Sequence, residues 1–389
     1  IYGAASQGGV INIITSTTTP VNSINAEYAG ANYKLNGGLS TQINEFNIFL
    51  NSTYETENSD SLLVNTSEID KRNLQSIALS VNKPLINNSK LSTFYTYNNL
   101  HQDLDNSTTD DKNYVNETTQ HLGTIQYDWK LKSNVLFKIG YTKTITQRDY
   151  TNTPDSQSDV VSRNARYKSN IDKVFINSKY AVNAQNNIVF GLDIVNETGE
   201  FVDNGSSALG AYSSNQGNSD QSRAGVFSQY NNENKVVSVQ LGSRLERYGN
   251  KKTILTYALS LYRDISIINT TALINFRTGY RAGSLYERFN SVDGNNELEA
   301  ETSLAIEYGL LKKFKYANIK LGYFKNYIDN SIEYDNKSTF KYYNLKDETH
   351  TAGFELSVQG FSYKNLEFIR IDLASLEAKD ADGNRLLRR

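Results

Sequence analysis

The sequence predicts an all-β protein, a transmembrane antiparallel β-barrel, on three observations. Apolar and polar residues alternate with period two in many segments of the 389-residue chain, which is the pattern of strands with one apolar face. These segments run for roughly 10–16 residues, which is long for a soluble sheet and suits a tilted membrane span. Tight turns alternate with long polar connections, as is typical of outer-membrane barrels.

Composition agrees with this class and excludes others. The 27 Tyr, 16 Phe and only 3 Pro favour long strands and aromatic girdles, although any Tyr-rich β-protein would fit the composition equally well. A mean hydropathy of −0.55 is compatible with a barrel, because only alternate residues face lipid. The net charge of −2 argues against a nucleic-acid partner, and the lack of Cys excludes disulfides and zinc–thiolate sites.

The expected strands follow the alternation along the chain. In the segment 237–246, Leu241 and Leu245 fall on one face, while Arg244 and Glu246 fall on the other. The same pattern recurs at 46–50, 77–81, 135–142, 304–310 and 354–359. A soluble sandwich also alternates, but charged residues in mid-strand favour a wet lumen behind a lipid-facing surface. Roughly eighteen such strands are expected between residues 22 and 376.

The connections come in two sizes, and the sequence predicts that the short ones lie together at one end of the barrel. Short turns are expected at 232–235, 248–251 and 314–315, each joining two strands as a hairpin. Long loops rich in Asn, Asp and Ser are expected at 55–70, 101–117, 148–160, 200–223 and 281–299.

The first fifteen residues carry a motif with a family resemblance. Its landmarks are a Tyr-Gly pair, a Gly-Gly pair and an Asn within an apolar strand: Tyr2, Gly3, Gly8, Gly9 and Asn12. The stretch resembles the end of the plug domain of TonB-dependent outer-membrane receptors, where it precedes the barrel. The resemblance implies a plug end at residues 1–15, a linker at 16–22 and a partial receptor barrel at 23–389.

A second motif, in the last third of the chain, resembles a signature of the same receptor barrels. The matching residues are Arg281, Ser284, Leu285, Tyr286, Glu287, Gly294, Asn295, Glu301, Thr302 and Ser303. Three prolines of the family pattern are replaced by Gly283, Asn296 and Ala300. A third stretch, residues 376–389, resembles a later barrel strand with its acidic Gly loop and Arg pair.

Together the three landmarks imply a TonB-dependent receptor of the vitamin B12 and ferric-siderophore branch. Such a receptor takes up a scarce, bulky metal chelate or cobalamin across the outer membrane of a Gram-negative bacterium. Its partners are the outer-membrane lipid and the TonB-ExbB-ExbD complex, which grips a Ton box that this chain does not contain. The 22-stranded family barrel and the missing start Met further suggest a fragment lacking most of the plug and the last strands. The alternative is a non-transporting surface barrel, either an adhesin or a passive porin.

No catalytic constellation is visible, so the chain is expected not to be an enzyme and to require no cofactor. The acidic residues Asp103, Asp105, Asp110 and Asp111 form a loop cluster that could hold Ca²⁺, as some receptors resembling this one do. The competing interpretation is a solvated polar loop. The histidines lack metal-ligand spacing and are expected to be ordinary surface or lumen residues: His101, His121 and His350.

Overall fold

The computed structural model describes residues 22–60, 69–105, 111–154, 160–234, 236–249, 252–363, 366–380 and 383–385. The expected plug segment at 1–15 and most of the linker at 16–22 lie outside the described residues, so both stay predictions. Among the described residues, no helix has the length and apolarity needed to cross a bilayer.

The described chain is almost entirely strand. The first ten strands are β1 (Ser23–Ala29), β2 (Asn32–Ile43), β3 (Phe46–Asp60), β4 (Ile69–Leu85), β5 (Ser89–Asp103), β6 (Val115–Lys132), β7 (Val135–Asn152), β8 (Ser162–Ala181), β9 (Asn186–Ser207) and β10 (Gly210–Asn232). The others are β11 (Ser238–Tyr248), β12 (Lys252–Ile265), β13 (Thr270–Arg281), β14 (Glu301–Lys313), β15 (Ala317–Asp329), β16 (Ile332–Tyr334), β17 (Tyr342–Asn344), β18 (Thr349–Tyr363) and β19 (Leu366–Lys379). A 3-10 turn, η1 (Ser266–Ile268), follows β12, and one helix, α1 (Leu285–Phe289), follows β13.

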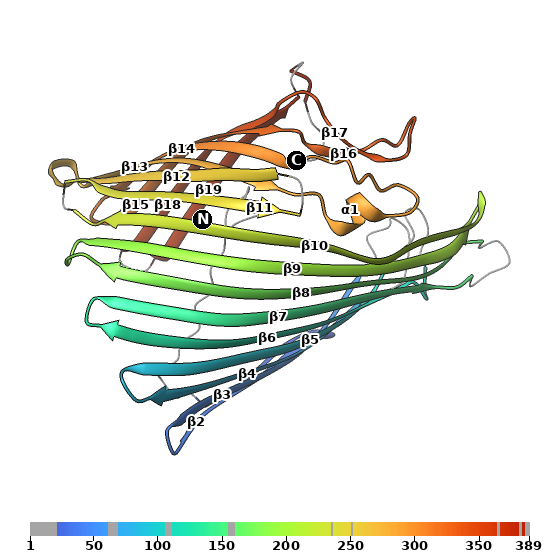
Figure 1. The fold of residues 1–389 in the computed structure, drawn as a ribbon, viewed down its shortest axis with the longest axis horizontal. Helices are drawn as coiled ribbons and strands as arrows, with labels where there is room; N and C mark the ends of the chain where they lie inside the picture. Colours follow the sequence, from blue (N-terminus) through green and yellow to red (C-terminus); the bar gives the residue numbers. More distant parts are fainter. Residues whose placement is uncertain are drawn as a thin grey trace.

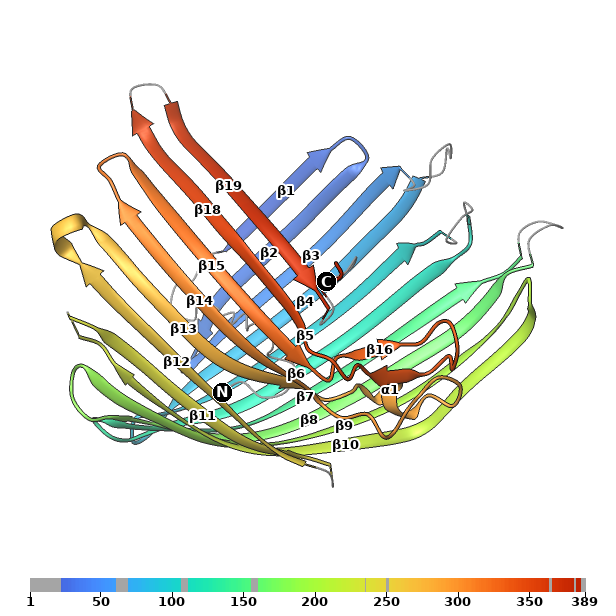
Figure 2. The ribbon, with the colours of Figure 1, turned by 90° about the horizontal axis from the view of Figure 1, so that it is seen from above.

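Seventeen of these strands form one antiparallel sheet in which each strand pairs with the next along the chain. The short hairpin β16–β17 forms a second sheet, so β15 pairs directly with β18. The large sheet curls, with β1–β5 and β13–β19 as opposite walls joined through β7–β10 (Figures 1 and 2). The predicted all-β antiparallel barrel architecture is confirmed, and the expected strand number is close to the one observed.

The sheet is inside out relative to a soluble protein. On β11, Leu245 is 47% exposed on the outer face, whereas its neighbour Arg244 is 3% exposed on the inner face. Large apolar residues are exposed on most strands, and among the described residues the buried polar side chains outnumber the buried apolar ones. Water-soluble folds place their apolar side chains inside. This distribution therefore fits an outer face covered by lipid and a polar lumen.

The short turns at one end of the sheet use asparagine in the left-handed backbone region. Asn87 and Asn88 have φ of 59° and 54° at the centre of the turn between β4 and β5. Asparagine tolerates positive φ better than most residues do, which lets the chain reverse within three residues. Asn44, with φ of 53°, lies in the turn between β2 and β3 at the same end.

Two predictions about connections were wrong. The expected loop 200–223 is instead a β-hairpin, because β9 runs on to Ser207 and β10 starts at Gly210. Its Asn, Ser and Gly residues conceal the strands from a propensity argument, but the backbone ladder continues across a bulge between Gln216 and Ser219. The expected turn 248–251 does join β11 to β12, but strict antiparallel alternation places it at the end where the long loops lie, here called the loop end.

Candidate functional site

The second sequence motif folds into a capped helical turn at the loop end, between β13 and β14. Ser284 is the N-cap of α1, and its hydroxyl oxygen accepts a hydrogen bond from the Glu287 backbone N–H at 3.2 Å. The Glu287 carboxylate in turn accepts the Ser284 N–H at 2.7 Å. This reciprocal capping box satisfies two donors that a helix end otherwise leaves unpaired. The capping box explains why the motif forms a helix of only five residues.

Arg281, the last residue of β13, joins three elements through two carboxylates. Its guanidinium Nη1 lies 2.8 Å from Glu287 Oε2, and its Nε lies 2.8 Å from Glu301 Oε2 at the start of β14. Glu301 Oε1 also accepts the backbone N–H of Ile332 in β16 at 2.7 Å. The motif residues Thr302 and Ser303 continue β14 opposite Tyr280 and Gly279. Arg281 therefore holds the helix, the β14 start and, through Glu301, the β16–β17 hairpin in one arrangement.

Gly294 and Asn295 complete the motif by closing the loop after α1. A Cβ atom on Gly294 would lie 2.4 Å from the backbone oxygen of Asn290, so only glycine fits here without a shift of the backbone. Asn295 donates its amide N–H to the carbonyl of Tyr342 in β17 at 2.9 Å. The structure thus brings together all ten residues of the second motif at the loop end.

The loop 282–300 docks on the inner wall of the extended β9–β10 hairpin (Figure 1). Leu285 is 7% exposed, and its Cδ1 lies 2.9 Å from where a Cβ of Gly199 would stand. Arg288 Nη1 donates to Gln221 Oε1 at 2.8 Å, and the Ser214 hydroxyl donates to Asn290 Oδ1 at 3.0 Å. These contacts hold α1 against the strands that the sequence had suggested were a loop.

Seven aromatic rings form a continuous chain at the loop end, here called the aromatic chain. Neighbouring ring centroids lie 5.0–6.3 Å apart in the order Tyr114, Tyr150, Tyr167, Phe201, Tyr286, Tyr342 and Tyr334. The chain follows the inner faces of β7, β8 and β9, crosses through α1 and ends in the β16–β17 hairpin. Such spacings are favourable for aromatic pairs and present a broad apolar surface edged with hydroxyl groups.

Arg163 on β8 fastens the first half of the aromatic chain. Its guanidinium carbon lies 4.7 Å from the centre of the Tyr150 ring, and its Nη1 donates to the hydroxyl of Tyr114 at 2.8 Å. The carboxylate of Asp203 lies 2.7 Å from Arg163 Nη2 and accepts the Tyr167 hydroxyl at 3.0 Å. The charges of this group are therefore paired internally, and its rings are held in position.

A cavity of about 240 Å³ lies between α1 and the inner wall of β7–β10. The rings of Tyr167, Phe201 and Tyr286 supply its apolar surface, while Arg148 and Gln216 supply polar groups. Binding cavities for small molecules commonly combine apolar and aromatic walls with a few polar groups. This cavity, together with the aromatic chain around it, is therefore the candidate ligand site, and the cavity itself has room for only part of a bulky ligand.

Burial controls protonation around α1. It raises the pKa of the Tyr286 phenol to about 12, with a further contribution from the nearby carboxylate of Asp293. The pKa of Tyr342 is raised for the same two reasons, and burial also raises the pKa of Asp293. Both phenols are protonated at neutral pH, as an ordinary tyrosine is, and can donate hydrogen bonds to an anionic oxygen.

A second polar cluster stiffens the lumen wall beside the loop. Arg244 on β11 lies 2.8 Å from Asp193 on β9 and pairs with Glu246, which also accepts the hydroxyl of Tyr280. A Cβ on Gly225 of β10 would lie 2.2 Å from the Arg244 guanidinium, so this glycine makes room for it. The four side chains are buried and satisfy one another, which is a structural arrangement rather than an open site.

The acidic residues suggested for calcium are only partly described, because Asp110 lies outside the described residues. Asp111 accepts the side-chain N–H of Asn152 at 2.7 Å, and Asp103 accepts the backbone N–H of Lys71 at 3.0 Å. Asp105 lies just beyond β5. Within the described part of the chain, no three acidic, His or Cys side chains form a group that could hold a metal ion. Calcium binding stays a prediction.

The three histidines lie on strands, each beside a polar or aromatic neighbour. His121 Nδ1 lies 2.9 Å from the Tyr95 hydroxyl, and the ring of His350 lies 6.4 Å from that of Tyr327. His101 lies 3.3 Å from Glu117. These contacts are ordinary for side chains at the surface of a sheet.

Sequence reasoning located the α1 loop but missed the aromatic chain and the Arg244 cluster. The signal for the aromatic chain was the excess of tyrosine, which the composition argument assigned to long strands and membrane girdles. The rings come from six elements and a loop, so their sequence spacing carries no pattern. Arg244 and Glu246 were recognised as lumen-facing, but Asp193 and Tyr280 are more than thirty residues away from them.

Comparisons with known proteins were made at the level of families, curated sequences and solved structures. Residues 59–388 match the family described as TonB dependent receptor-like, beta-barrel. No curated protein matches the chain significantly. Among solved structures, the ferric yersiniabactin uptake receptor FyuA from Yersinia pestis is similar, with a TM-score of 0.74 and 13% identity over 98% of this chain and 67% of that one.

Two further structures share the fold. The siderophore receptor PiuA from Acinetobacter baumannii has a TM-score of 0.69 and 15% identity over 98% of this chain and 68% of that one. The copper transporter OprC has a TM-score of 0.77 and 10% identity over 95% of this chain and 64% of that one. This chain therefore spans about two thirds of the length of these proteins. Because the family match covers most of its residues, the chain belongs to the TonB-dependent receptor-like β-barrel family.

Proposed function

We propose that this chain is part of a TonB-dependent receptor in the outer membrane of a Gram-negative bacterium, where it takes up a bulky metal chelate. The family membership supports a receptor rather than an enzyme, and the exposed apolar outer face supports a membrane location. The energy for uptake would come from the TonB-ExbB-ExbD complex. An adhesin or a passive porin remains the alternative, and dependence on TonB separates the two.

The observation that carries the ligand proposal is the aromatic chain around the 240 Å³ cavity. Flat aromatic groups of a ligand can stack on Tyr167, Phe201 and Tyr286, and protonated phenols can donate to the oxygen atoms of an anionic chelate. We propose an iron–siderophore complex as the ligand, because chelating groups of siderophores offer both features. Cobalamin is the second candidate.

Growth under iron limitation tests the transport proposal. Bacteria lacking their own siderophore receptors would express the complete gene encoding this chain and receive a panel of iron–siderophores, or vitamin B12 in a B12-dependent strain. We expect rescue by at least one chelate in cells with TonB and none in cells without it. Rescue that persists without TonB would instead support a passive porin, and the absence of both rescue and chelate binding would support an adhesin.

Binding of the rescuing chelate, labelled with radioactive iron, tests the site. Replacing both rings in the Tyr167→Ala/Tyr286→Ala variant removes two stacking surfaces and should weaken binding about tenfold or more. The matched control is Tyr257→Ala/Tyr308→Ala, which removes two exposed rings from the outer face. Equal binding by both variants would exclude the aromatic chain as the ligand site.

A further inference from the structure

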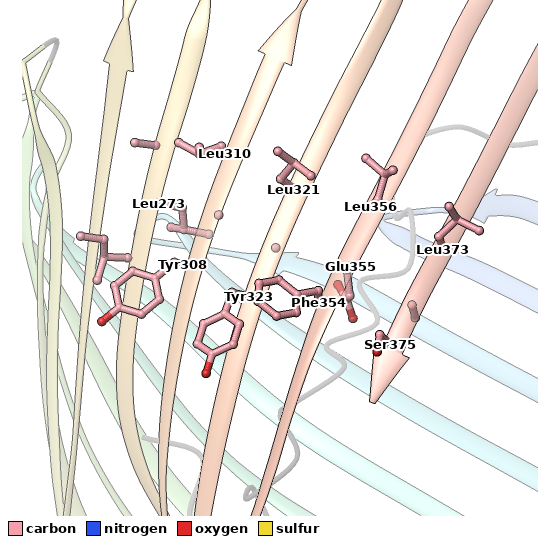
Figure 3. A pocket seen from close by; sticks show the side chains of 15 residues that line it. Leu273, Tyr308, Leu310, Leu321, Tyr323, Phe354, Glu355, Leu356, Leu373 and Ser375 are labelled. Carbon is pink, nitrogen blue, oxygen red and sulfur yellow. The ribbon is translucent and has the colours of Figure 1, made fainter. Parts of the chain in front are cut away.

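Partly or fully buried arginines line the inner wall of the sheet, and most of them have a carboxylate partner. The outer wall is largely apolar, as in the groove of about 740 Å³ between β13 and β19, which leucines and aromatic rings line (Figure 3). A buried charge is costly unless an opposite charge lies beside it. Among the described residues, five inner-wall arginines satisfy this condition, each with a carboxylate at ion-pair distance: Arg72, Arg163, Arg244, Arg277 and Arg281.

Two arginines beside α1 lack such a partner. Arg223 lies on the inner face of β10, opposite the buried Tyr248 of β11, and Arg288 is the fourth residue of α1. Both side chains are partly buried, and the Nε atom of each is buried without a hydrogen-bond acceptor. Within the described part of the chain, Arg288 has only the neutral amide of Gln221 as a side-chain acceptor, at 2.8 Å, and Arg223 has none.

The register of the sheet places both guanidinium groups beside one polar side chain. Gln221 and Arg223 are two residues apart on β10, so both lie on the inner face, with their Cα atoms about 7 Å apart. Gln221 is 6% exposed and accepts Arg288 through its Oε1, which leaves its amide N–H groups available to donate. Three sets of donors therefore lie together on the lumen side of β10, here called the donor site: Gln221, Arg223 and Arg288.

Arg281 and Arg288 show how differently the loop treats two guanidinium groups. The carboxylates of Glu301 and Glu287 raise the pKa of Arg281 in spite of its burial. Burial lowers the pKa of Arg288, and Glu297 in the same loop attracts it only from beyond ion-pair distance. The charge of Arg288 is therefore poorly compensated, and an anion beside it would gain charge-assisted hydrogen bonds.

One carboxylate faces the donor site from the neighbouring strand. Glu197 of β9 is the register partner of Gln221 on the inner face. It also lines the candidate ligand cavity, together with Thr146 of β7 and Ser169 of β8, and it forms no ion pair among the described residues. The donor site consequently adjoins the ligand cavity, and the charge of Glu197 opposes an anion there without neutralising either arginine.

We propose that Gln221, Arg223 and Arg288 form an oxyanion site, which binds a phosphate, sulfate or carboxylate group. The planar fork of a guanidinium matches the oxygen atoms of such groups, and two forks with one amide can hold a single anion from several sides. The anion is either a free ion or an anionic group of the chelate, since the site adjoins the cavity. Binding of a free ion requires neither uptake nor TonB, so failure of this proposal leaves the transport proposal intact.

Isothermal titration of inorganic phosphate into the complete protein, purified in a non-ionic detergent, tests the proposal. We expect one phosphate per chain and a loss of affinity of about tenfold or more in Arg223→Gln and in Arg288→Gln, the scale of a lost hydrogen bond to a charged group. Glu197→Gln should bind phosphate about fivefold more tightly, because it removes a nearby negative charge. The matched control, Lys313→Gln/Lys320→Gln, removes two exposed inner-face lysines on β14 and β15 and should leave the affinity unchanged.

Ferric citrate, a chelate with carboxylate groups, distinguishes the two sources of the anion. Displacement of phosphate by ferric citrate at lower concentrations than by iron-free citrate would assign the site to a group of the chelate. Equal displacement by the two would assign it to a free ion.

Three results would overturn the proposal. The first is no binding of phosphate to the complete protein, which would leave the donor site to a side chain of the protein itself. The second is equal affinity in the unchanged protein and in both arginine variants. The third is an affinity that Glu197→Gln does not alter, which would place the phosphate elsewhere. Mobility on electrophoresis before and after heating verifies that every variant is folded.

Discussion

At the scale of single residues, the loop end depends on a few side chains that each hold several partners. Arg281 bridges Glu287 and Glu301, and Glu301 also holds the backbone of Ile332. Charge-assisted hydrogen bonds of this kind are stronger than neutral ones, and Glu301 is 7% exposed, so water screens it little. Removing Arg281 would leave a buried carboxylate without its cation, which is costly.

We predict that Arg281→Gln loosens the whole loop 282–300. The expected loss is about 2 kcal/mol of local stability, the scale of hydrogen bonds to charged groups. Hydrogen–deuterium exchange of the peptide containing α1 measures it. The control is Arg166→Gln, which breaks an exposed pair with Asp149 and should change exchange by less than about 1 kcal/mol. Equal exchange in the two variants would contradict a central role for Arg281.

The buried carboxyl group of Asp293 should make the stability of the loop 282–300 depend on pH. Burial raises its pKa, so the folded loop holds this proton more tightly than the unfolded chain does. The stabilisation is complete below the ordinary pKa of aspartate and is lost as pH rises through the raised value. We predict that α1 exchanges its amide hydrogens more slowly in the Asp293→Asn variant than in the unchanged chain at pH 7. At pH 3 the two proteins should exchange at the same rate. Exchange measured at both values decides this, and a difference that is the same at both would refute the titration.

At the scale of elements, α1 attaches the loop 282–300 to the β9–β10 hairpin. Leu285 fits beside Gly199, and Arg288 and Asn290 add hydrogen bonds to β10. The hairpin can receive them because β9 and β10 have 22 and 23 residues, about twice the length needed to span a bilayer. Local sequence preference missed this hairpin because its stability comes from the ladder and from the docked loop rather than from β-formers.

We predict that Leu285→Ala weakens the contact between α1 and the β9–β10 hairpin. A buried leucine reduced to alanine costs about 2–5 kcal/mol in a protein core, and we expect the lower end because Leu285 lies in a loop outside any large apolar core. Exchange should rise both in α1 and in the β9–β10 tip, because each covers the other. Val292→Ala on the same loop is the control, since Val292 is 59% exposed and should change exchange by less than about 0.5 kcal/mol. Increased exchange confined to α1 would argue against coupling between the two elements.

At the scale of the whole molecule, the two faces of one curled sheet meet different solvents. Exposed leucines and tyrosines cover the outside, and charged clusters such as Arg244 with Asp193 lie inside. In a membrane barrel the apolar side chains can leave water by facing lipid, so the fold does not require a large apolar core. Among the described residues, the largest buried apolar cluster is correspondingly small, consisting of Tyr248, Tyr280 and Ala300.

We predict that the same substitution has opposite consequences on the two faces. Leu245→Arg introduces a charge into the lipid-facing band of β11 and should destabilise the barrel, by an amount that reaches about 2–4 kcal/mol for an Arg at the bilayer midplane. Gln240→Arg places the same side chain on the lumen face of that strand and should be nearly neutral. Unfolding by urea in phospholipid vesicles measures both. Similar values for the two variants would contradict a lipid-covered outer face.

The sequence by itself determined the class of fold, the two-faced strands and the position of the α1 loop. These follow from period-two alternation and from motifs whose residues are close together in the chain. Tertiary structure alone decided which rings join Tyr167 to Tyr342, where Leu285 docks, and which buried side chains pair with Arg244. Those contacts join residues far apart in sequence, and the register and curl of the sheet bring them together only once every strand has paired.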